Sequence, residues 1–426
     1  GGSTGLVCLS CETQWDSAVP QRCPDCGGPL DPRYDGLTPA VDDTTGGKET
    51  TGRTVGPGRP EIPAPLPVAA GTLPSLGVGK TPLVDCPALA AECGVGRLLL
   101  KAEGQQPTGG LVDREMAVAV TAARAHGAER VALPSTGNGG QAAAAFAARA
   151  GLEATVYVPS RAPFQNKAMI NVHGGDMTVV GGRYSDALAA FEDGEDHRLR
   201  AEGDVTTYSL APFDTPYRHE GAKTLAYELA AQLPDAGAPA DADAQEASNA
   251  VDGLAVPDAV VHPTGHGTGL LGIQKGFREL EAAGHVDRQP RLYAAQAQGC
   301  APLVECWEQY GGSGPVPDVE PVTHPDTICG TLEVPDPAGG PFAIEALSAT
   351  GGGAIDSPDD ESLDAALALA SEGVPTSATG GVAASAAESL ADEGVLGPTD
   401  TVVVVDPATA NREADLLRSR LMSKGV

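Results

Sequence analysis

Short apolar runs alternate with longer Ala-rich segments along the chain from about residue 78. The runs predict strands, and the segments predict helices because their apolar positions recur every three or four residues. Strands are expected at 97–101, 129–134, 153–158, 176–180, 258–262, 291–296 and 401–405. Helices are expected at 115–126, 140–151, 164–174, 184–194, 217–233, 269–283, 300–309, 361–371, 382–393 and 411–423. Strands that alternate with helices predict βαβ units, and therefore an α/β fold with mostly parallel sheets.

The N-terminal segment carries a different pattern, with four cysteines in two pairs. Cys8 and Cys11 form one Cys-x-x-Cys pair, and Cys23 and Cys26 form the second after a spacer of eleven residues. Two such pairs supply four thiolates in a tetrahedron, which is the arrangement that a structural Zn²⁺ prefers. Two disulfides are the alternative, and a reducing cytoplasm disfavours them. Residues 1–32 are therefore expected to form a zinc ribbon, and the Gly-, Pro- and Thr-rich residues 33–62 a linker or extended arm.

The net charge of the chain argues against some classes of binding partner. Lys and Arg number 27 against 57 Asp and Glu, so the formal net charge is −30. Such a surface repels phosphates, and a nucleic acid or an anionic membrane is not expected as a partner. No apolar run is long enough to cross a membrane, and no charged segment followed by an apolar one indicates a signal peptide. An acidic, Lys-poor composition rich in small residues is typical of a cytoplasmic protein adapted to high salt.

Salt should therefore stabilise the folded chain. The surface charges repel one another at low ionic strength, and at molar KCl the Debye length falls to about 3 Å, which screens that repulsion. Thermal melting in low and in molar KCl measures the effect directly, and we expect the midpoint to rise with salt. A melting temperature that stays level across this range would count against adaptation to high salt.

Two glycine-rich loops follow predicted strands and precede predicted helices. The first is Ser135-Thr136-Gly137-Asn138, and the second is Gly265-His266-Gly267-Thr268-Gly269. Small residues expose backbone N–H groups at a helix N-terminus, which favours binding of a carboxylate or a phosphate. The second loop is neither a Walker A motif nor a dinucleotide fingerprint, because it lacks their residue spacing. His266 is the one histidine in these loops and is a candidate phosphate contact.

In this order, the motifs resemble the threonine synthase family of pyridoxal-phosphate (PLP) enzymes, in its archaeal form with an N-terminal zinc ribbon. The matching segments are Lys80-Thr81-Pro82-Leu83, Glu103 to Arg114, Ser135 to Asn138, Glu220-Gly-Ala-Lys223-Thr224 and Gly265 to Gly269. The resemblance implies that Ser135, Thr136, Gly137 and Asn138 hold a substrate carboxylate and that Asn138 reaches the phenolic oxygen of the cofactor. It also implies that Gly265, His266, Gly267, Thr268 and Gly269 surround the cofactor phosphate.

The resemblance further implies a tryptophan synthase beta-like fold of type II, with two α/β domains that each hold a parallel sheet. Residues 63–110 and 216–426 are expected to form the large domain and residues 111–215 the small one. The family is usually dimeric, so a homodimer, or pairing with a related subunit, is expected.

One departure from the family pattern bears on catalysis. The family segment "PTGSFKDR" carries the Lys that binds PLP covalently, and here the same frame reads Pro107-Thr-Gly-Gly-Leu-Val112-Asp-Arg114. A Val side chain cannot form an imine, and the Lys that shuttles protons in the family is also lost. Gly110 replaces the preceding Ser. No catalytic residue is therefore assigned, because Val112 occupies the Schiff-base position.

The end of the last strand also departs from the family pattern. Val402 to Val405 lead into Asp406 where the family usually has Thr-Gly. Asp406 is a candidate partner of the pyridine nitrogen, and the alternative is an Asp that caps an ordinary turn. A relocated Schiff base would need one of the seven lysines, which are Lys48, Lys80, Lys101, Lys167, Lys223, Lys275 and Lys424.

Three hypotheses for function remain. The first is a catalytically degenerate paralogue that binds an amino acid or phosphate ligand, or a partner subunit, with PLP either bound non-covalently or absent. The second is an active PLP-dependent lyase or threonine synthase that uses a relocated Lys on O-phosphohomoserine or on a related hydroxy or phospho amino acid. The third is a scaffold or regulatory protein. The retention of both glycine-rich loops favours the first two.

Overall fold

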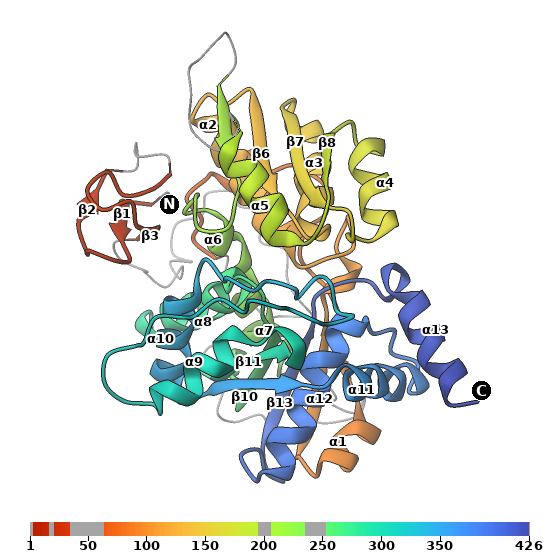
Figure 1. Ribbon diagram of the computed structural model, residues 1–426. Helices are drawn as coiled ribbons and strands as arrows, with labels where there is room; N and C mark the ends of the chain where they lie inside the picture. The colour runs from red at the N-terminus through yellow and green to blue at the C-terminus, as the bar shows by residue number, and fades with distance from the viewer. Residues whose placement is uncertain (1–2, 17–20, 35–63, 195–205, 235–252, 426) are drawn as a thin grey trace.

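The computed structural model describes residues 3–16, 21–34, 64–194, 206–234 and 253–425. Their strands form three sheets, and the two larger sheets lie in separate lobes stacked one above the other (Figure 1). The small N-terminal sheet lies beside these lobes, near helix α6 (Arg218–Ala222). Of the predicted linker 33–62, only Arg33 and Tyr34 belong to the described residues.

The N-terminal sheet is antiparallel, in the order β2-β1-β3. It consists of β1 (Gly5–Cys8), β2 (Gln14–Trp15) and β3 (Leu30–Arg33). Its core holds Leu6 and Leu30 beside two buried cysteines, with Trp15 packed against them. So small a core cannot by itself stabilise a fold, which is why segments of this size rely on metals or disulfides.

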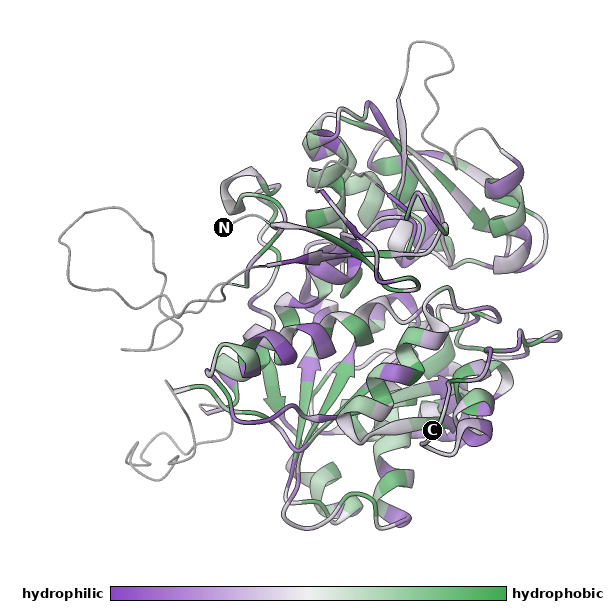
Figure 2. Ribbon diagram, turned by 90° about the vertical axis from the view of Figure 1, so that its left-hand side faces the viewer, coloured by the Kyte–Doolittle hydropathy of each residue, from purple (hydrophilic) through white to green (hydrophobic). Residues whose placement is uncertain are grey.

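The lower lobe is built on a six-stranded sheet in the order β12-β11-β10-β13-β5-β4. Its strands are β4 (Leu83–Asp85), β5 (Arg97–Ala102), β10 (Ala259–Pro263), β11 (Arg291–Ala297), β12 (Gly353–Ser357) and β13 (Thr401–Asp406). All neighbouring pairs are parallel except β4 with β5. The central strands are mostly apolar because helices cover both faces, as Figure 2 shows for the hydrophobic strands of this lobe.

Alternate residues of one strand show how the two faces of this sheet are buried. Val402 and Val404 of β13 pack with helices α1 (Pro87–Cys93), α11 (Asp359–Ser371) and α12 (Ala378–Asp392). Val403 and Val405 pack on the opposite face with α7 (Thr224–Gln232), α8 (Thr268–Ala282), α9 (Pro302–Tyr310) and α10 (Gly340–Thr350). The period-two alternation of side chains along a strand therefore divides the Val-rich run between two cores. The last helix, α13 (Ala414–Ser423), lies beside α11.

The upper lobe holds a four-stranded parallel sheet in the order β8-β7-β6-β9. Its strands are β6 (Arg130–Pro134), β7 (Glu153–Pro159), β8 (Asp176–Val180) and β9 (Thr207–Ser209). Its helices are α2 (Val112–Ala125), α3 (Asn138–Ala150), α4 (Phe164–Val172) and α5 (Tyr184–Asp193). Short 3-10 turns occur at Ala70–Thr72, Glu103–Gln105, Gln298–Cys300 and Ala410–Arg412.

The structure confirms the predicted strands and helices and adds several that the pattern did not predict. The added elements are the strands of the ribbon, β4, α1, β9, α10 and β12. The single helix expected at 217–233 is two helices, α6 and α7, that meet at Lys223. The division into a large domain (63–110 and 216–426) and a small one (111–215) stays a prediction. Among the described helices, none is long and apolar enough to cross a membrane.

A buried charge network ties the two lobes together beneath α2. Arg114 is among the largest fully buried side chains, and its Nε lies 2.7 Å from Glu103 Oε2 while its Nη2 lies 2.9 Å from Glu228 Oε2. Burial alone would raise the pKa of Glu103, but Arg114 outweighs it and lowers that pKa to about 2. Lys101 completes the network, with its Nζ 2.6 Å from Glu228 Oε1. The charges compensate one another, which a network this deep requires.

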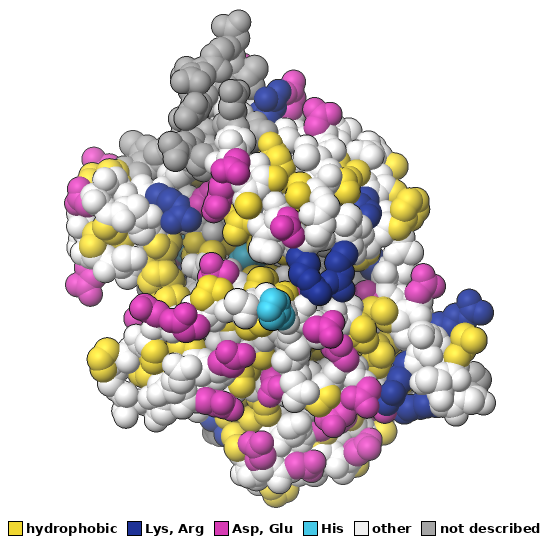
Figure 3. All heavy atoms as spheres, viewed as in Figure 1, with side chains coloured by type: hydrophobic (Ala, Val, Ile, Leu, Met, Phe, Trp, Pro, Cys, Tyr) yellow, Lys and Arg dark blue, Asp and Glu magenta, His cyan; other side chains and the backbone are white. Residues whose placement is uncertain are grey.

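Acidic side chains are spread over the face shown in Figure 3, chiefly on the lower lobe. Lys and Arg side chains are sparser on the same face, in keeping with the net charge of −30. The surface is hollowed between the lobes, where the candidate site lies.

Candidate functional site

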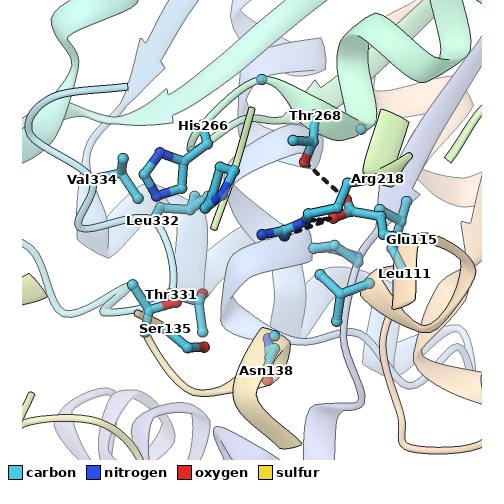
Figure 4. A pocket seen from close by; sticks show the side chains of 18 of the residues that line it. Leu111, Glu115, Ser135, Asn138, Arg218, His266, Thr268, Thr331, Leu332 and Val334 are labelled. Carbon is cyan, nitrogen blue, oxygen red and sulfur yellow. Dashed lines mark hydrogen bonds and ion pairs between the residues drawn. The ribbon is translucent and has the colours of Figure 1, made fainter. Parts of the chain in front are cut away.

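A pocket opens between the lobes at the carboxyl ends of β6, β10 and β13. Parallel sheets present their ligand sites at these ends, since the following helices begin there. The starts of α2, α3 and α8 supply Val112, Asn138 and Thr268 to its walls. Figure 4 shows Asn138 and Thr268 among the side chains around the pocket. Its volume is about 130 Å³. This is close to the roughly 150 Å³ of a cavity that holds a benzene-sized molecule.

The predicted Schiff-base position lies in the pocket wall. Val112 is the first residue of α2, is half-buried and lines the pocket. The loop before it is held by Asp113, which accepts hydrogen bonds from the N–H of Thr108, at 2.6 Å, and from its hydroxyl. Burial raises the pKa of Asp113 to about 6 despite those bonds. The site therefore presents a hydrocarbon side chain from the position that faces the cavity.

The lysines of the described part of the chain lie elsewhere, and none of them lines this pocket. Lys101 donates to the carbonyl of Thr81 as well as to Glu228. Lys223 and Lys275 both pair with Glu220 in a separate buried cluster. The remaining described lysines are Lys80, Lys167 and Lys424, and Lys48 lies outside the described residues.

The Ser135 to Asn138 loop forms the turn into α3, as expected. Ser135 Oγ accepts from the N–H groups of Gly137, at 3.0 Å, and Gly140, at 2.8 Å. Gly137 has φ of +138°, a conformation that L side chains rarely adopt, and a Cβ there would also meet Asn166. Ser135 thus engages two of the amides that a ligand carboxylate would otherwise meet. Ser135, Thr136 and Asn138 themselves line the pocket.

The side chain of Asn138 is held in place by two hydrogen bonds that the sequence does not predict. Its Oδ1 accepts from Asn166 Nδ2 at 3.0 Å and from Arg412 Nη1 at 2.5 Å. Arg412 also donates to the carbonyl of Thr108, so it links the turn after β13 to the loop before α2. Burial, which here outweighs the pull of Asp113, lowers the pKa of Arg412. Arg412 was not identified from the sequence, since only the fold brings it to Asn138.

The Gly265 to Gly269 loop lies opposite, where β10 turns into α8, and all five of its residues line the pocket. Gly267 precedes the helix with φ of +92°, which favours glycine. His266 is packed edge-on against Tyr184, with ring centroids 5.0 Å apart. Burial and the nearby Arg218 lower the pKa of His266 to about 3, so it is neutral at pH 7. An anion bound at the N-terminus of α8 would therefore meet a neutral His266 and not a positively charged one.

Glu115 and Arg218 meet at this helix end, and neither was identified from the sequence. Glu115 Oε1 accepts a hydrogen bond of 2.9 Å from Thr268 Oγ1. Glu115 Oε2 accepts one of 2.7 Å from Arg218 Nε and lies 2.6 Å from Arg218 Nη2 (Figure 4). The two side chains are 2% and 8% exposed. A carboxylate of the chain itself thus occupies the side of the pocket where an anion was expected.

Asp406 lies at the end of β13 and does not itself line the pocket, although the next residue, Pro407, does. Its Oδ1 accepts from the hydroxyl of Ser377 at 2.5 Å and from the N–H of Ser377 at 3.3 Å. Burial raises the pKa of Asp406 to about 7. Ser377 in turn caps α12 through the N–H of Gly380. These contacts link the end of β13 to the start of α12, and both the capping role of Asp406 and its role as a cofactor partner stay predictions.

The four N-terminal cysteines converge at one end of the ribbon. Their sulfur atoms lie within 4.8 Å of one another. Cys8 and Cys26 are 3.5 Å apart, and Cys11 and Cys23 are 3.7 Å apart. Zn–S bonds of about 2.3 Å in a tetrahedron place sulfur atoms roughly 3.8 Å apart, whereas a disulfide needs about 2.05 Å. The cluster is compatible with zinc and does not fit two disulfides.

Comparison with known proteins agrees with this fold. Residues 74–407 match the family described as "Pyridoxal-phosphate dependent enzyme". Threonine synthase of Methanosarcina acetivorans is 30% identical over 403 residues, covering 94% of this chain and 90% of that protein. Threonine synthase of Methanocaldococcus jannaschii is 29% identical over 412 residues, covering 96% and 93%. The chain therefore belongs to the threonine synthase family of PLP-dependent enzymes.

Solved structures support the fold assignment. An L-serine ammonia-lyase from Rhizomucor miehei aligns with a TM-score of 0.63 at 20% identity, over 81% of this chain and 98% of that one. Threonine deaminase isoform 2 from Solanum lycopersicum aligns with a TM-score of 0.62 at 18% identity, over 81% and 88%. The two lobes are thus the two parallel sheets of a fold-type-II PLP enzyme, preceded by a small cysteine-cluster sheet.

The described residues of the pocket do not fit covalently bound PLP. An imine needs a primary amine, and Val112 supplies none. A cofactor phosphate at the start of α8 would meet the carboxylate of Glu115, which already accepts from Thr268. Two negative charges placed next to each other in a buried site repel each other strongly, which disfavours binding of the phosphate. The described pocket thus lacks an amine at Val112 and holds the carboxylate of Glu115 beside the start of α8.

Proposed function

We propose that this chain is a catalytically degenerate member of the threonine synthase family, whose pocket binds a small amino acid without a covalent bond. The observation that carries the proposal is that Val112 lines the pocket, at the position that the sequence resemblance assigns to the family's Schiff-base Lys. The placement of the described lysines supports it, since each lies outside the lining of the pocket. A pocket without an amine to form an imine can still bind a ligand, so we favour ligand binding over catalysis.

The size and polarity of the pocket support an amino acid as the ligand. A volume of about 130 Å³ suits a molecule the size of threonine better than one joined to a cofactor. The positive end of the α3 helix dipole favours an anionic group there, although Ser135 Oγ already accepts from the N–H groups of Gly137 and Gly140. Hydroxyls of Thr331 and Thr379, 2.6 Å apart, line the opposite wall. These groups would bind and orient the ligand, while Leu111 and Val334 exclude water.

An active enzyme is the second candidate, and the comparisons favour it over degeneracy. The named relatives are threonine synthases, and two of them cover at least 94% of this chain. This candidate would convert O-phosphohomoserine to threonine, or eliminate from a related amino acid, with PLP and a relocated Lys. Since no described Lys lines the pocket, it needs Lys48 or a rearranged side chain.

The wider setting follows from the composition and the cysteine cluster. We infer a structural Zn²⁺ on Cys8, Cys11, Cys23 and Cys26, a high-salt cytoplasm, and a homodimer or a pair with a related subunit. Neither a nucleic acid nor a membrane is expected as a partner, because the −30 charge repels both kinds of phosphate surface.

Two assays on the purified chain in molar KCl separate the candidates. With PLP and O-phosphohomoserine, we expect no release of inorganic phosphate above the protein-free blank. With L-threonine, L-serine or L-homoserine and no PLP, we expect at least one to raise the melting temperature, by about 3 °C at saturation, because a ligand that binds the folded state stabilises it. D-Threonine serves as the control and should leave the melting temperature unchanged.

Phosphate release that grows with protein concentration and requires PLP would establish the second candidate instead. A melting temperature that none of the three L-amino acids moves would contradict the binding function.

A further inference from the structure

Glu115 places a buried carboxylate in the wall of the pocket, at the start of α8. It lies in the first turn of α2, and it reaches across to Thr268, the first residue of the 15-residue helix α8. Arg218 of α6 donates to the same carboxylate from the other side and is itself fixed by the carbonyl of Leu210 at 3.1 Å. Three helices thus converge on one carboxylate at a helix N-terminus.

A carboxylate in this position satisfies the groups that would otherwise bind an external anion. The N-terminus of α8 favours negative charge, and Arg218 adds a buried guanidinium that pairs with carboxylate or phosphate equally well. Glu115 engages both the Thr268 hydroxyl and Arg218, at 2.9 Å and 2.7 Å. A second anion would displace it or bring two negative charges together, and both cost free energy in a buried site.

His262 gives a second, independent observation on this side of the pocket, which is a buried nitrogen without a hydrogen-bond partner. It lines the pocket from the end of β10, is 5% exposed, and its Nε2 has no hydrogen-bond partner. Thr264 gives its one hydroxyl proton to the carbonyl of His262 at 2.8 Å. His262 Nδ1, 3.0 Å from the same hydroxyl oxygen, must therefore be the donor to it.

This hydrogen-bond arrangement fixes the tautomer of His262 and leaves a lone pair on Nε2. Burial lowers the pKa of His262 to about 4, so the ring is neutral at pH 7. The free Nε2 lies against the start of α8, where a Cβ on Gly269 would come within 2.5 Å of it. A buried acceptor without a partner costs free energy, and a ligand N–H or O–H would remove that cost.

We infer that Glu115 is an internal anion that closes the phosphate cradle at α8, and that the pocket therefore takes a small amino acid without a phosphate group, whose ammonium or hydroxyl donates to His262 Nε2. This inference rests on the proposed function and names the class of its ligand. It separates this chain from a protein that would accept PLP or a phosphorylated amino acid in the same place.

Glu115→Ala tests the inference with inorganic phosphate as the probe. The substitution removes the internal anion and leaves Arg218 and the Thr268 hydroxyl at the helix end without their carboxylate partner. We expect phosphate to bind the variant at least about tenfold more tightly than it binds the wild-type chain, because a charge-assisted pair with Arg218 is formed only in the variant. The readouts are ³¹P line broadening and the rise in melting temperature with phosphate at constant ionic strength.

Glu279→Gln is the matched control, because Glu279 is a buried carboxylate on α8, the helix whose first residue Glu115 contacts, and it also pairs with a buried cation, Lys223, at 3.0 Å. It should gain no phosphate response. Glu115→Gln is the second variant, which keeps the side-chain volume if Glu115→Ala does not fold. It should bind phosphate more weakly than Glu115→Ala but more tightly than the wild-type chain. Wild-type phosphate affinity in every folded Glu115 variant would overturn the inference.

The outcomes also separate this inference from the proposed function. If the Glu115 variants do not gain phosphate while an L-amino acid still stabilises the wild-type chain, the closed cradle is wrong and the binding function stands. If the wild-type chain releases phosphate from O-phosphohomoserine, the proposed function fails whatever the variants do.

Discussion

Val112→Lys combined with Glu115→Ala should hold about one PLP per chain in a form that borohydride reduces, whereas the wild-type chain should hold none. The first change supplies the primary amine that an imine requires. The second opens the helix end of α8, where Glu115 now accepts from Thr268 at 2.9 Å. Val112 lines the pocket and begins α2, so a Lys there extends into the cavity from a helical position that tolerates it.

The absorption spectrum in the visible range and the intact mass after reduction measure this gain. Val112→Met with Glu115→Ala is the control, because Met has a similar length and no amine. Val112→Lys alone should hold less PLP than the double variant, since the cradle stays closed. Gly110 is best left unchanged, because a Cβ there would come within 3.2 Å of the Pro407 carbonyl oxygen. A folded double variant with no reducible PLP would mean that these two positions do not decide cofactor binding.

Cys23→Ser should abolish zinc binding and lower the melting temperature by at least about 5 °C. Loss of one thiolate removes a ligand from a site whose metal supplies much of the folding free energy of the ribbon. The ribbon also places Asp31 in the body of the protein, with its Oδ1 2.8 Å from His219 Nε2 and 2.5 Å from Lys275 Nζ. An unfolded ribbon would leave those buried groups without their carboxylate, which costs about 3–5 kcal/mol for a buried pair.

Zinc content by a colorimetric chelator and the melting temperature measure this effect. Cys93→Ser is the control, since Cys93 is half-buried in α1 and lies outside the cysteine cluster. It should keep one zinc per chain and a melting temperature within about 2 °C of the wild-type value. Retention of zinc by Cys23→Ser, or an unchanged melting temperature after its loss, would contradict a structural role for the metal.

The periodicity of the sequence predicts most of the two larger sheets because most of their strands are buried apolar runs and their helices have an apolar stripe. The prediction fails where the local pattern of apolar residues is weak. β12 (Gly353–Ser357) is a partly buried edge strand, and its one neighbour, β11, defines it. The helix predicted at 217–233 is interrupted at Lys223, after a segment in which Gly221 packs so closely on the backbone of α2 that a Cβ would lie 2.0 Å from the Arg114 carbonyl oxygen.

In the pocket, too, local motifs can be predicted from the sequence, whereas contacts that depend on tertiary packing cannot. The two glycine-rich loops are local motifs, and the fold brings Ser135 and Thr268 into one cavity as their positions after strands predict. Glu115 and Arg218 are 103 residues apart, and their meeting depends on how α2 and α6 pack. His262 carries no sequence signal, since its unpartnered Nε2 follows from a hydrogen bond to Thr264 and from burial.

The most direct measurement of the central claim is the intact mass of the wild-type chain after incubation with PLP in molar KCl and reduction with borohydride. An imine at any Lys, Lys48 included, would become a permanent pyridoxyl group and add its mass. Because Val112 occupies the Schiff-base position and no described Lys lines the pocket, we predict a mass equal to that of the untreated chain. A stoichiometric pyridoxyl adduct on one lysine would contradict the account and establish a relocated Schiff base.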